Sequence, residues 1–439
     1  MEEPSTSIRR PTFVSETRFN QRSEELPALL ECKRELQEGG YHARVIGRHL
    51  AAQQHFLAHL AQLNISPQAV READVEDFLR TKLQQYCARH GHQPRDIGQW
   101  RTRYTAAIYR VLRAIQGQWP SEGRLLTKSE RFQRELLEGY RRWLTEVCGL
   151  SSKTLCKNSR AARIFLHWLE ERASTESLAV LNVADIDAFF SWRMPGLRRA
   201  TRHGVCQCLR SFLRYLHASN RIRADLSGFV SGPILYGDAE IPRALTEEQV
   251  KAVLDCTRSD RSPKGLRDYA MLLMLATYGL RAGEVVWLSL QDISWKEERL
   301  RVRRSKTQTE SFLPLVRPVG DALIKYLKHG RPKTAFRQVF LRSRAPFRPF
   351  SGTSPLNYVI LARLKEAGIE VKGRHGPHAF RYARAISLLR ASVPLKSISD
   401  LLGHTSTSST RVYLKLETED LRMISLEVPR KDSDAGLAR

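Results

Sequence analysis

The sequence has no run of apolar residues long enough to cross a bilayer, which requires about 20 in succession. Its first residues, MEEPSTSIRRPTFVSE, are polar and lack the apolar centre of a secretory signal peptide. We therefore expect no membrane partner, and the two absences together favour the cytoplasm.

The cysteines lack a pattern. All seven are scattered along the chain, with no CxxC pair and no regular spacing. Paired spacings are typical of zinc sites and of the disulfide frameworks in small secreted domains. We therefore expect neither a structural metal nor a disulfide scaffold, and Cys206 and Cys208 are predicted to be packing residues.

Acidic residues are scarce relative to basic ones. Lysine and arginine number 72 against 46 aspartate and glutamate, which gives a formal net charge of +26. Such an excess of positive charge indicates a polyanionic partner, chiefly nucleic acid or an anionic membrane. A solvated basic surface without a specific partner is the alternative that composition leaves open.

Length and periodicity predict several domains. A chain of 439 residues is expected to form two to four of them. Apolar residues recur at helical spacing through two long blocks, and glycine and proline then interrupt the pattern. We predict a flexible lead (1–20), an N-terminal helical domain (21–120), a second helical domain (125–223), a linker (224–243), a further domain (244–420) and a tail (421–439).

The two helical blocks resemble each other in sequence. Gly40–Leu60 aligns with Gly149–Leu169 without a gap, which matches the two glycines and a Phe-Leu-x-x-Leu pattern at the end. Ala73–Phe78 also resembles Ala184–Phe189 after a shift of two residues. A duplicated helical module is our hypothesis. Two unrelated amphipathic helices with a common pattern are the alternative.

The second block carries two strongly basic helices. At 100° per residue, one side of the first helix gathers Lys153, Lys157, Arg160 and Arg163, and apolar residues fall on the other side. The second helix carries Arg198, Arg199, Arg202, Arg210 and Arg214. Because such helices can lie along phosphates, we predict that these residues bind DNA. A charged face in contact with solvent is the alternative for each residue taken singly.

The C-terminal region is predicted to combine helices with a small sheet. Thr246 and Gln249 form a capping-box pattern at the start of one helix, and a second helix over 265–275 ends at Tyr278-Gly279. Alternating residues at 299–304 and 311–315 flank a polar turn, which is a hairpin signal. The chain is therefore predicted to be mainly α, with a small antiparallel β-sheet in its C-terminal domain.

Five features of this region carry a family resemblance. They are Arg281 in GLRAGE, Lys306 in the hairpin turn, HAFR at 378–381, LGH at 402–404, and Tyr413. In this order and at these intervals they resemble the tyrosine recombinases, the phage-integrase-like enzymes that transfer DNA strands. The resemblance is close from about residue 244 to 416, and it implies a catalytic domain there. It also implies a core-binding, SAM-like DNA-binding domain over 125–223.

The resemblance implies a role for each of these residues. Breaking DNA without losing its bond energy requires a covalent intermediate on a side-chain nucleophile. The family forms a 3′-phosphotyrosine and frees a 5′-hydroxyl, with guanidiniums on the non-bridging oxygens. The implied set is Tyr413 as nucleophile, Arg281 and Arg381 on the phosphate, Lys306 as acid, His378 as base and His404 as donor, with Glu284 in support. We expect no metal and no other cofactor, because cationic side chains do the work of Mg²⁺ here.

Four of these residues also have an alternative, purely structural explanation. Arg281 could simply pair with Glu284 on its own helical turn. Gly403 is typical of a helix C-cap, so His404 could only mark a helix end. Tyr413 could be a core residue, and Lys306 is one of several basic residues near the turn.

The function predicted from this resemblance is site-specific DNA recombination, as integration, excision or transposition. A topoisomerase IB-like relaxing enzyme and an inactive DNA-binding accessory protein are the alternatives. The expected partners are double-stranded DNA and further copies of the chain, in a tetrameric synapse on DNA near the nucleoid. The long N-terminal block resembles that of transposon-borne members, which act with sister recombinases.

Overall fold

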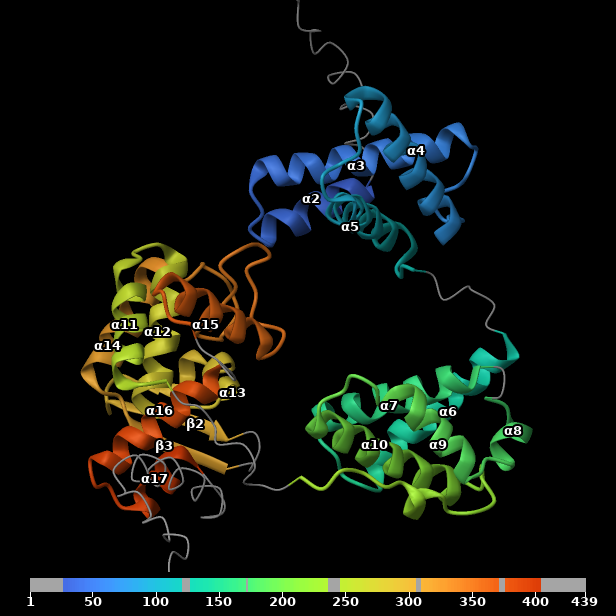
Figure 1. Ribbon diagram of the computed structural model, residues 1–439. Helices are drawn as coiled ribbons and strands as arrows, with labels where there is room; N and C mark the ends of the chain where they lie inside the picture. Colours follow the sequence, from blue (N-terminus) through green and yellow to red (C-terminus); the bar gives the residue numbers. More distant parts are fainter. Residues whose placement is uncertain are drawn as a thin grey trace, which may run out of the picture. The chain divides into compact units, whose positions relative to one another are not determined.

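The computed structural model describes residues 27–120, 127–170, 173–235, 245–304, 309–370 and 376–403. The predicted lead (1–20) and tail (421–439), together with Lys306, His404 and Tyr413, lie outside the described residues. By their contacts, residues 122–240 form one compact unit and the rest of the chain forms another. Figure 1 shows the N-terminal helices in blue, the 122–240 unit in green and the C-terminal region in yellow to red.

Helix starts follow the caps in the sequence. Thr246 caps its helix through a capping box with Gln249, as predicted, and Thr127 forms a second capping box with Glu130. The N-terminal block forms α2 (Pro27–Glu38), α3 (Ala43–Gln62), α4 (Glu72–His90) and α5 (Ile97–Gln116). The 122–240 unit forms α6 (Lys128–Glu146), α7 (Ser152–Leu169), α8 (Thr175–Ala179), α9 (Val183–Arg193), α10 (Arg199–Ala218) and the 3₁₀ turn η2 (Ser227–Phe229).

The two helical blocks share a helix order. Helices α2, α3, α4 and α5 correspond to α6, α7, α9 and α10, and the short α8 is an addition in the second block. Gly40 before α3 and Gly149 before α7 both have left-handed backbone, with φ of 74° and 60°. In both blocks the second long helix packs against the last one. These agreements support the hypothesis of a duplicated module.

The C-terminal region begins with α11 (Glu247–Ser259), α12 (Pro263–Tyr278) and α13 (Ala282–Val286). A sheet follows the 3₁₀ turn η3 (Leu290–Asp292), and it consists of β1 (Ile293–Ser294), β2 (Arg299–Arg304) and β3 (Thr309–Pro314). The remaining elements are α14 (Arg317–Lys325), the π-helical turn η4 (Tyr326–Gly330), α15 (Ser354–Glu366), α16 (Pro377–Arg390) and α17 (Leu395–Leu402). One large hydrophobic core joins the sheet to the surrounding helices.

The sheet is antiparallel in the order β1-β2-β3, with Leu300 opposite Leu313. This confirms the predicted fold class, mainly α with a small antiparallel sheet. One detail of the prediction was wrong, because Thr309 and Glu310 had been assigned to the turn and belong to β3. Both residues pair across the hairpin, with Arg304 and Arg303, so the ladder extends further toward the turn than the hydrophobic alternation indicated.

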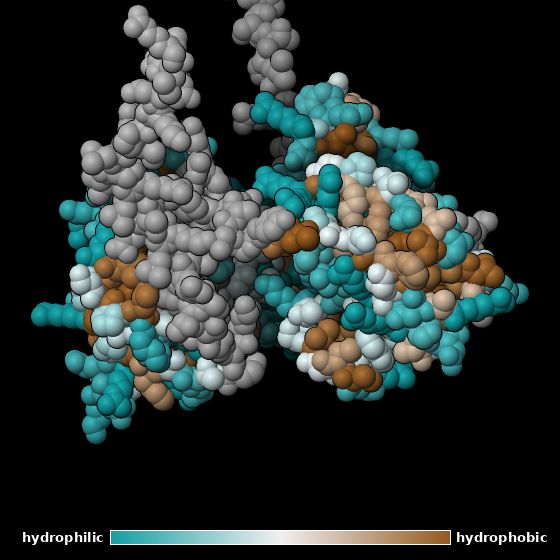
Figure 2. All heavy atoms as spheres, turned by 60° about the horizontal axis from the view of Figure 1, so that its bottom comes forward, coloured by the Kyte–Doolittle hydropathy of each residue, from teal (hydrophilic) through white to brown (hydrophobic). Residues whose placement is uncertain are grey.

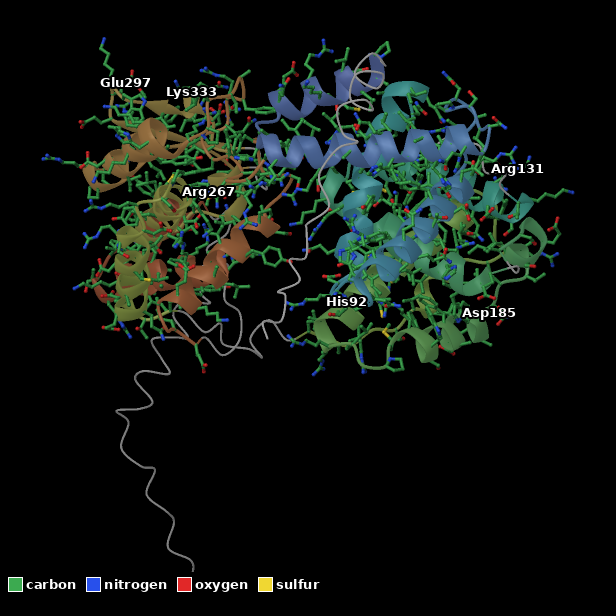
Figure 3. All side chains as sticks on the ribbon, turned by 90° about the horizontal axis from the view of Figure 1, so that it is seen from above. His92, Arg131, Asp185, Arg267, Glu297 and Lys333 are labelled. Carbon is green, nitrogen blue, oxygen red and sulfur yellow. The ribbon has the colours of Figure 1, made fainter. Side chains whose placement is uncertain are left out.

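A buried ion cluster fixes the helices behind the sheet. Asp268 on α12 is fully buried and accepts hydrogen bonds from Arg267, Arg363 and Lys264. Because a buried carboxylate is stable only when it is paired, this cluster ties α12 to α15. Figure 3 shows Arg267 among the helices of the C-terminal region, with Glu297 and Lys333 at its edge.

The described surface is mostly polar. Figure 2 shows one face on which hydrophilic side chains alternate with smaller apolar patches. The exposed large apolar side chains include Trp192, Trp287 and Phe312. Among the helices that the structure describes, none has the length and apolar character to cross a bilayer.

Candidate active site

The junction of α12 and α13 positions Arg281. Helix α12 ends at Gly279, which adopts left-handed backbone with φ of 61°, and Arg281 is the N-cap of α13. The backbone N–H of Arg281 donates to Oε2 of Glu284 at 2.8 Å, and its Nη1 donates to Oε1 at 3.0 Å. The Glu284 side chain is only 2% exposed. The local ion pair is therefore present, and it holds the guanidinium in one orientation.

A second hydrogen bond connects Arg281 to the end of α17. Its Nη2 donates to the carbonyl oxygen of Gly403 at 2.9 Å. The Arg281 side chain is 23% exposed, so part of the guanidinium remains at the surface. Arg281 thus holds the backbone immediately before His404 and keeps an edge accessible to a ligand.

Helix α16 positions His378 and Arg381 within its first two turns. Pro377 occupies the first turn, where its missing N–H costs nothing. Arg381 is buried, and it donates through Nη1 to the Gly279 carbonyl at 2.8 Å and through Nη2 to the Leu402 carbonyl at 2.6 Å. His378 is exposed, with its ring centroid 6.4 Å from that of Tyr382.

The structure therefore brings the two predicted phosphate-binding arginines together. Arg281 and Arg381 donate to the consecutive carbonyls of Gly403 and Leu402. Gly279, which accepts from Arg381, lies two residues before Arg281. Two guanidiniums on neighbouring backbone groups form a positive site that suits a phosphodiester.

Gly403 is required where it stands. It caps α17 with left-handed backbone at φ of 64°, which agrees with the sequence-based interpretation as a helix C-cap. A Cβ at this position would lie 2.6 Å from Cζ of Arg304. Both the backbone conformation and the close approach of an arginine therefore demand glycine.

Arg304 is the residue that sequence reasoning missed. It was counted among the basic residues near the turn, yet its side chain is 1% exposed. Its Nη1 lies 3.2 Å from Glu284 Oε2 and 3.0 Å from the Leu402 carbonyl oxygen. Burial lowers the pKa of Arg304, and the Glu284 carboxylate opposes that shift. The signal was the alternation of β2, which places Leu300, Val302 and Arg304 on the inner face.

The predicted DNA-binding residues of α7 all face solvent. Lys153, Lys157, Arg160 and Arg163 are exposed, opposite the buried Phe165 and Leu166. On α10 and just before it, Arg198, Arg199, Arg202 and Arg214 are also exposed. Arg210 differs, because it is half-buried and its Nε and Nη2 donate to the Val230 carbonyl at 2.9 and 2.6 Å. Arg210 therefore has an observed structural role in holding the segment after α10.

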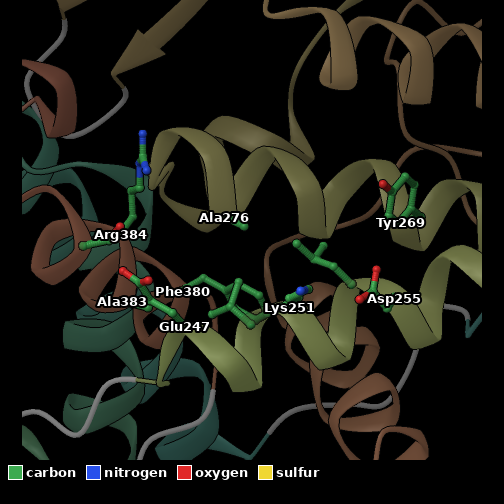
Figure 4. Close-up of a pocket in the computed structure, with 11 residues that line it drawn as sticks. Glu247, Lys251, Asp255, Tyr269, Ala276, Phe380, Ala383 and Arg384 are labelled. Carbon is green, nitrogen blue, oxygen red and sulfur yellow. The ribbon is translucent and has the colours of Figure 1, made fainter. Parts of the chain in front are cut away.

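A separate hollow of about 300 Å³ lies between α11, α12 and α16. Figure 4 shows Glu247, Lys251 and Asp255 on its α11 side, opposite Tyr269 of α12 and Arg384 of α16. Neither Arg281 nor Arg381 lines it. The hollow is therefore distinct from the arginine site.

The C-terminal region that contains these arginines matches a known protein family. The model of the phage integrase family matches residues 243–420. An integrase/recombinase of Sinorhizobium fredii, y4gC, is 49% identical over 195 residues, which are 44% of this chain and 100% of that protein. A second one from the same organism, y4rA, is 36% identical over 67% of this chain and 70% of its own length. Tyrosine recombinase XerD of Proteus mirabilis is 32% identical over 64% of this chain and 88% of its own length.

Solved structures give the same fold at lower identity. XerH site-specific recombinase, in a post-cleavage complex with palindromic difH substrate, is 15% identical with a TM-score of 0.51. The match covers 69% of this chain and 97% of that one. It supports the helical architecture with a small sheet, independently of sequence identity.

Proposed function

The chain belongs to the phage integrase family of tyrosine recombinases, and from this premise we propose how its residues cleave and rejoin DNA. The protein is a site-specific recombinase that breaks and reseals DNA strands. The observation that carries the assignment of roles is the pair of arginines, Arg281 and Arg381, anchored on the consecutive carbonyls of Gly403 and Leu402. That backbone leads directly into His404 and, nine residues later, Tyr413.

In the proposed reaction, the Tyr413 oxygen attacks the scissile phosphorus and the bond to the 5′-oxygen breaks. The products are a 3′-phosphotyrosine and a free 5′-hydroxyl, so the bond energy is conserved. The 5′-hydroxyl of a second strand then attacks the phosphotyrosine, restores the phosphodiester and releases Tyr413. Each half of the exchange is a transesterification that neither consumes nor releases water.

Proton transfers complete the scheme. A tyrosine hydroxyl has a pKa of about 10, so it needs a base and a positive environment to attack at neutral pH. We assign the base to His378, which is exposed at the start of α16. Lys306 protonates the leaving 5′-oxygen, and His404 donates a hydrogen bond to the phosphate.

Charge on the phosphate is balanced by Arg281 and Arg381. Negative charge grows on the non-bridging oxygens as the fifth bond to phosphorus forms, and fixed guanidiniums stabilise it without reorganisation. Glu284 supports this arrangement by holding Nη1 of Arg281. Its near-complete burial keeps the carboxylate away from the DNA.

We propose that the substrate is double-stranded DNA, and that both the catalytic domain (244–420) and a core-binding domain (125–223) bind it. The exposed basic face of α7 supports the second assignment. Separate hydrophobic cores in the two regions support the division into domains. The N-terminal block (21–120) has its own core and is proposed to take part in assembly or in binding a further stretch of DNA.

Recombination requires paired sites, so we propose a tetrameric synapse of this chain, with sister recombinases as further partners. The tail (421–439) is proposed to pack on a neighbouring protomer through the short apolar run Met423–Val428. Removing residues 422–439 should abolish synapsis while leaving binding to a single site intact. Action on a mobile element, by integration, excision or transposition, would take place in the cytoplasm at the nucleoid.

Substitution of the nucleophile tests the proposed function. A suicide substrate, nicked near the scissile phosphate so that the short fragment carrying the freed 5′-hydroxyl is lost, traps the covalent intermediate, which denaturing gels then detect. The Tyr413→Phe protein should form no adduct and should bind site DNA as the native protein does. An adduct formed by Tyr413→Phe would show that another residue is the nucleophile.

A further inference from the structure

Arg304 is a charged side chain in the interior of the protein, where charge is costly. Its alternation with Leu300 and Val302 on β2 places it on the inner face, and its side chain is 1% exposed. The cost of taking a guanidinium out of water is several kcal/mol and is offset only by close partners. Such a residue needs an explanation in terms of what it contacts.

The guanidinium of Arg304 joins three parts of the chain. Its Nη1 donates to Glu284 Oε2 at 3.2 Å and to the Leu402 carbonyl at 3.0 Å. Its Nη2 donates to the Leu401 carbonyl at 2.8 Å. Nε lies 3.3 Å from Oγ of Ser311 on the neighbouring strand. Helix α13, strands β2 and β3, and the end of α17 thus meet at one side chain.

Both partners of Nη1 are shared with the predicted phosphate-binding residues. Glu284 also accepts from Nη1 of Arg281, and the Leu402 carbonyl also accepts from Nη2 of Arg381. Arg304 therefore lies between the anchors of the two guanidiniums. We propose that Arg304 is a positioning residue, which sets the placement of Arg281 and Arg381 relative to each other and thereby tunes strand cleavage. This role rests on the proposed function.

Only arginine fits the position. Its planar fork directs five N–H donors along fixed lines, which lets it serve a carboxylate and two carbonyls together. A lysine ammonium in the same space would keep the charge next to Glu284 but could not reach all of these acceptors in their present directions. The absent Cβ of Gly403 provides the room for the guanidinium, since a methyl there would lie 2.6 Å from Cζ.

A purely structural role would have different consequences. It would lower stability and the fraction of folded protein, but each folded molecule would cleave at the normal rate. A positioning role changes the rate constant of the chemical step at saturating DNA, because displacement of about 1 Å in a reacting site costs about 100-fold. The rate constant of a single turnover does not depend on the folded fraction, so it separates the two roles.

The test uses the full-length protein, a suicide substrate and three variants. Arg304→Met removes the guanidinium and retains the apolar stem, and Arg304→Lys retains the charge. Arg301→Met is the matched control on the same strand, because Arg301 pairs with the buried Asp292, which keeps Arg303 as a second partner. We expect Arg304→Met to cleave about 100-fold more slowly at saturating DNA, with site affinity within about threefold. Arg304→Lys should recover part of the loss, and Arg301→Met should cleave as the native protein does.

A second substrate identifies what Arg304 acts on. A methylphosphonate at the scissile position removes the negative charge that Arg281 and Arg381 neutralise. If Arg304 acts through those two residues, the ratio of native to Arg304→Met rate constants should be much smaller on the methylphosphonate than on the phosphodiester. An equal ratio on the two substrates would overturn the proposal.

The outcomes separate the two levels of inference. A native protein that forms no adduct would overturn the proposed function, and the role of Arg304 with it. A native protein that cleaves, with Arg304→Met equally fast at saturating DNA, would overturn only the role of Arg304. If Arg304→Met does not fold, Arg304→Lys decides alone, and a native rate constant in that variant would count against the proposal.

Discussion

Nη2 of Arg281 donates a hydrogen bond to the carbonyl oxygen of Gly403, 2.9 Å away and 122 positions later in the sequence. The contact makes the position of Arg281, a proposed catalytic residue, depend on the end of α17. In return, it fixes the backbone that precedes His404. The proposed active site therefore depends on a contact between two distant parts of the C-terminal region, and a defect at either end of this bond should affect the other.

Replacing Gly403 by alanine tests this dependence. The left-handed backbone costs an alanine about 1–2 kcal/mol, and the new methyl would press on the buried Arg304 guanidinium. We expect lower stability and a cleavage rate constant reduced by at least about tenfold at saturating DNA. Thermal unfolding and single-turnover cleavage measure the two effects.

Gly368 provides the matched control. It follows α15 in the same region with φ of 69°, and nothing lies within 4 Å of the place where its Cβ would be. Gly368→Ala therefore carries the backbone cost without the contact. Equal loss of cleavage in both variants would mean that general destabilisation, and not the displacement of Arg304, explains the effect.

The proposed phosphate-binding role of Arg381 predicts a loss of cleavage rate without a matching loss of DNA affinity. Arg381→Lys keeps the charge but cannot reach both the Gly279 and Leu402 carbonyls while facing a phosphate. We expect cleavage to slow by about 100- to 1000-fold, while site affinity changes little because the lysine retains the positive charge that attracts the DNA backbone. Arg384→Lys, three residues later on α16, should retain the native rate. Native cleavage by Arg381→Lys would contradict the assignment.

Local signals in the sequence foretold much of this region. The capping box at Thr246 and the break at Gly279 were predicted, because caps depend on residues close in sequence. The hairpin was predicted from alternation, although β3 begins two residues earlier than expected. A local sequence pattern predicts a helix or strand well when the interactions that stabilise it come from residues close in the sequence.

Arg304 shows where local pattern stops. The alternation of β2 places Arg304 on the inner face. A buried guanidinium is stable only when it has partners, and the alternation does not identify them. Those partners, Glu284 and the end of α17, lie 20 and about 98 positions away. Their convergence is a property of the tertiary fold, so the alternation of β2 indicates the direction of the Arg304 side chain but not its partners. The catalytic roles of all the named residues remain predictions. Three of them, Lys306, His404 and Tyr413, also lie outside the described part of the chain.

The acid dependence of stability should reveal the anchoring of α15. A hydrogen bond from Ser262 and the guanidinium of Arg363 lower the pKa of Asp260 from 3.8 to about 2. Because the folded pKa lies below the unfolded one, the ionised carboxylate stabilises the protein above about pH 4, and this contribution is lost as pH falls toward 2. At neutral pH, the free energy of unfolding of the native protein should exceed that of Asp260→Asn by at most about 2 kcal/mol.

Urea unfolding of both proteins between pH 6 and pH 2 measures that difference in stability. The pH-dependent contributions of the titratable groups that both proteins share cancel in the difference. The gap in unfolding midpoint should narrow below pH 4. Asp255→Asn on α11, an exposed carboxylate paired only with Arg258 among the described residues, serves as the control and should show little change. A gap that stays constant with pH would contradict the proposed coupling.

The exposed basic face of α7 predicts a change in the salt dependence of DNA binding. Each phosphate contact releases counterions and adds about 0.9 to the slope of log affinity against log salt. Replacing Lys153 and Lys157 by alanine should therefore lower the slope by about 2 and weaken binding to all sequences alike. Arg141→Ala with Arg142→Ala, two exposed residues on α6, removes the same charge from another helix of the same unit. If the two double variants lowered the slope equally, the loss would not be specific to α7, and the proposed contact between its basic face and the phosphates would be contradicted.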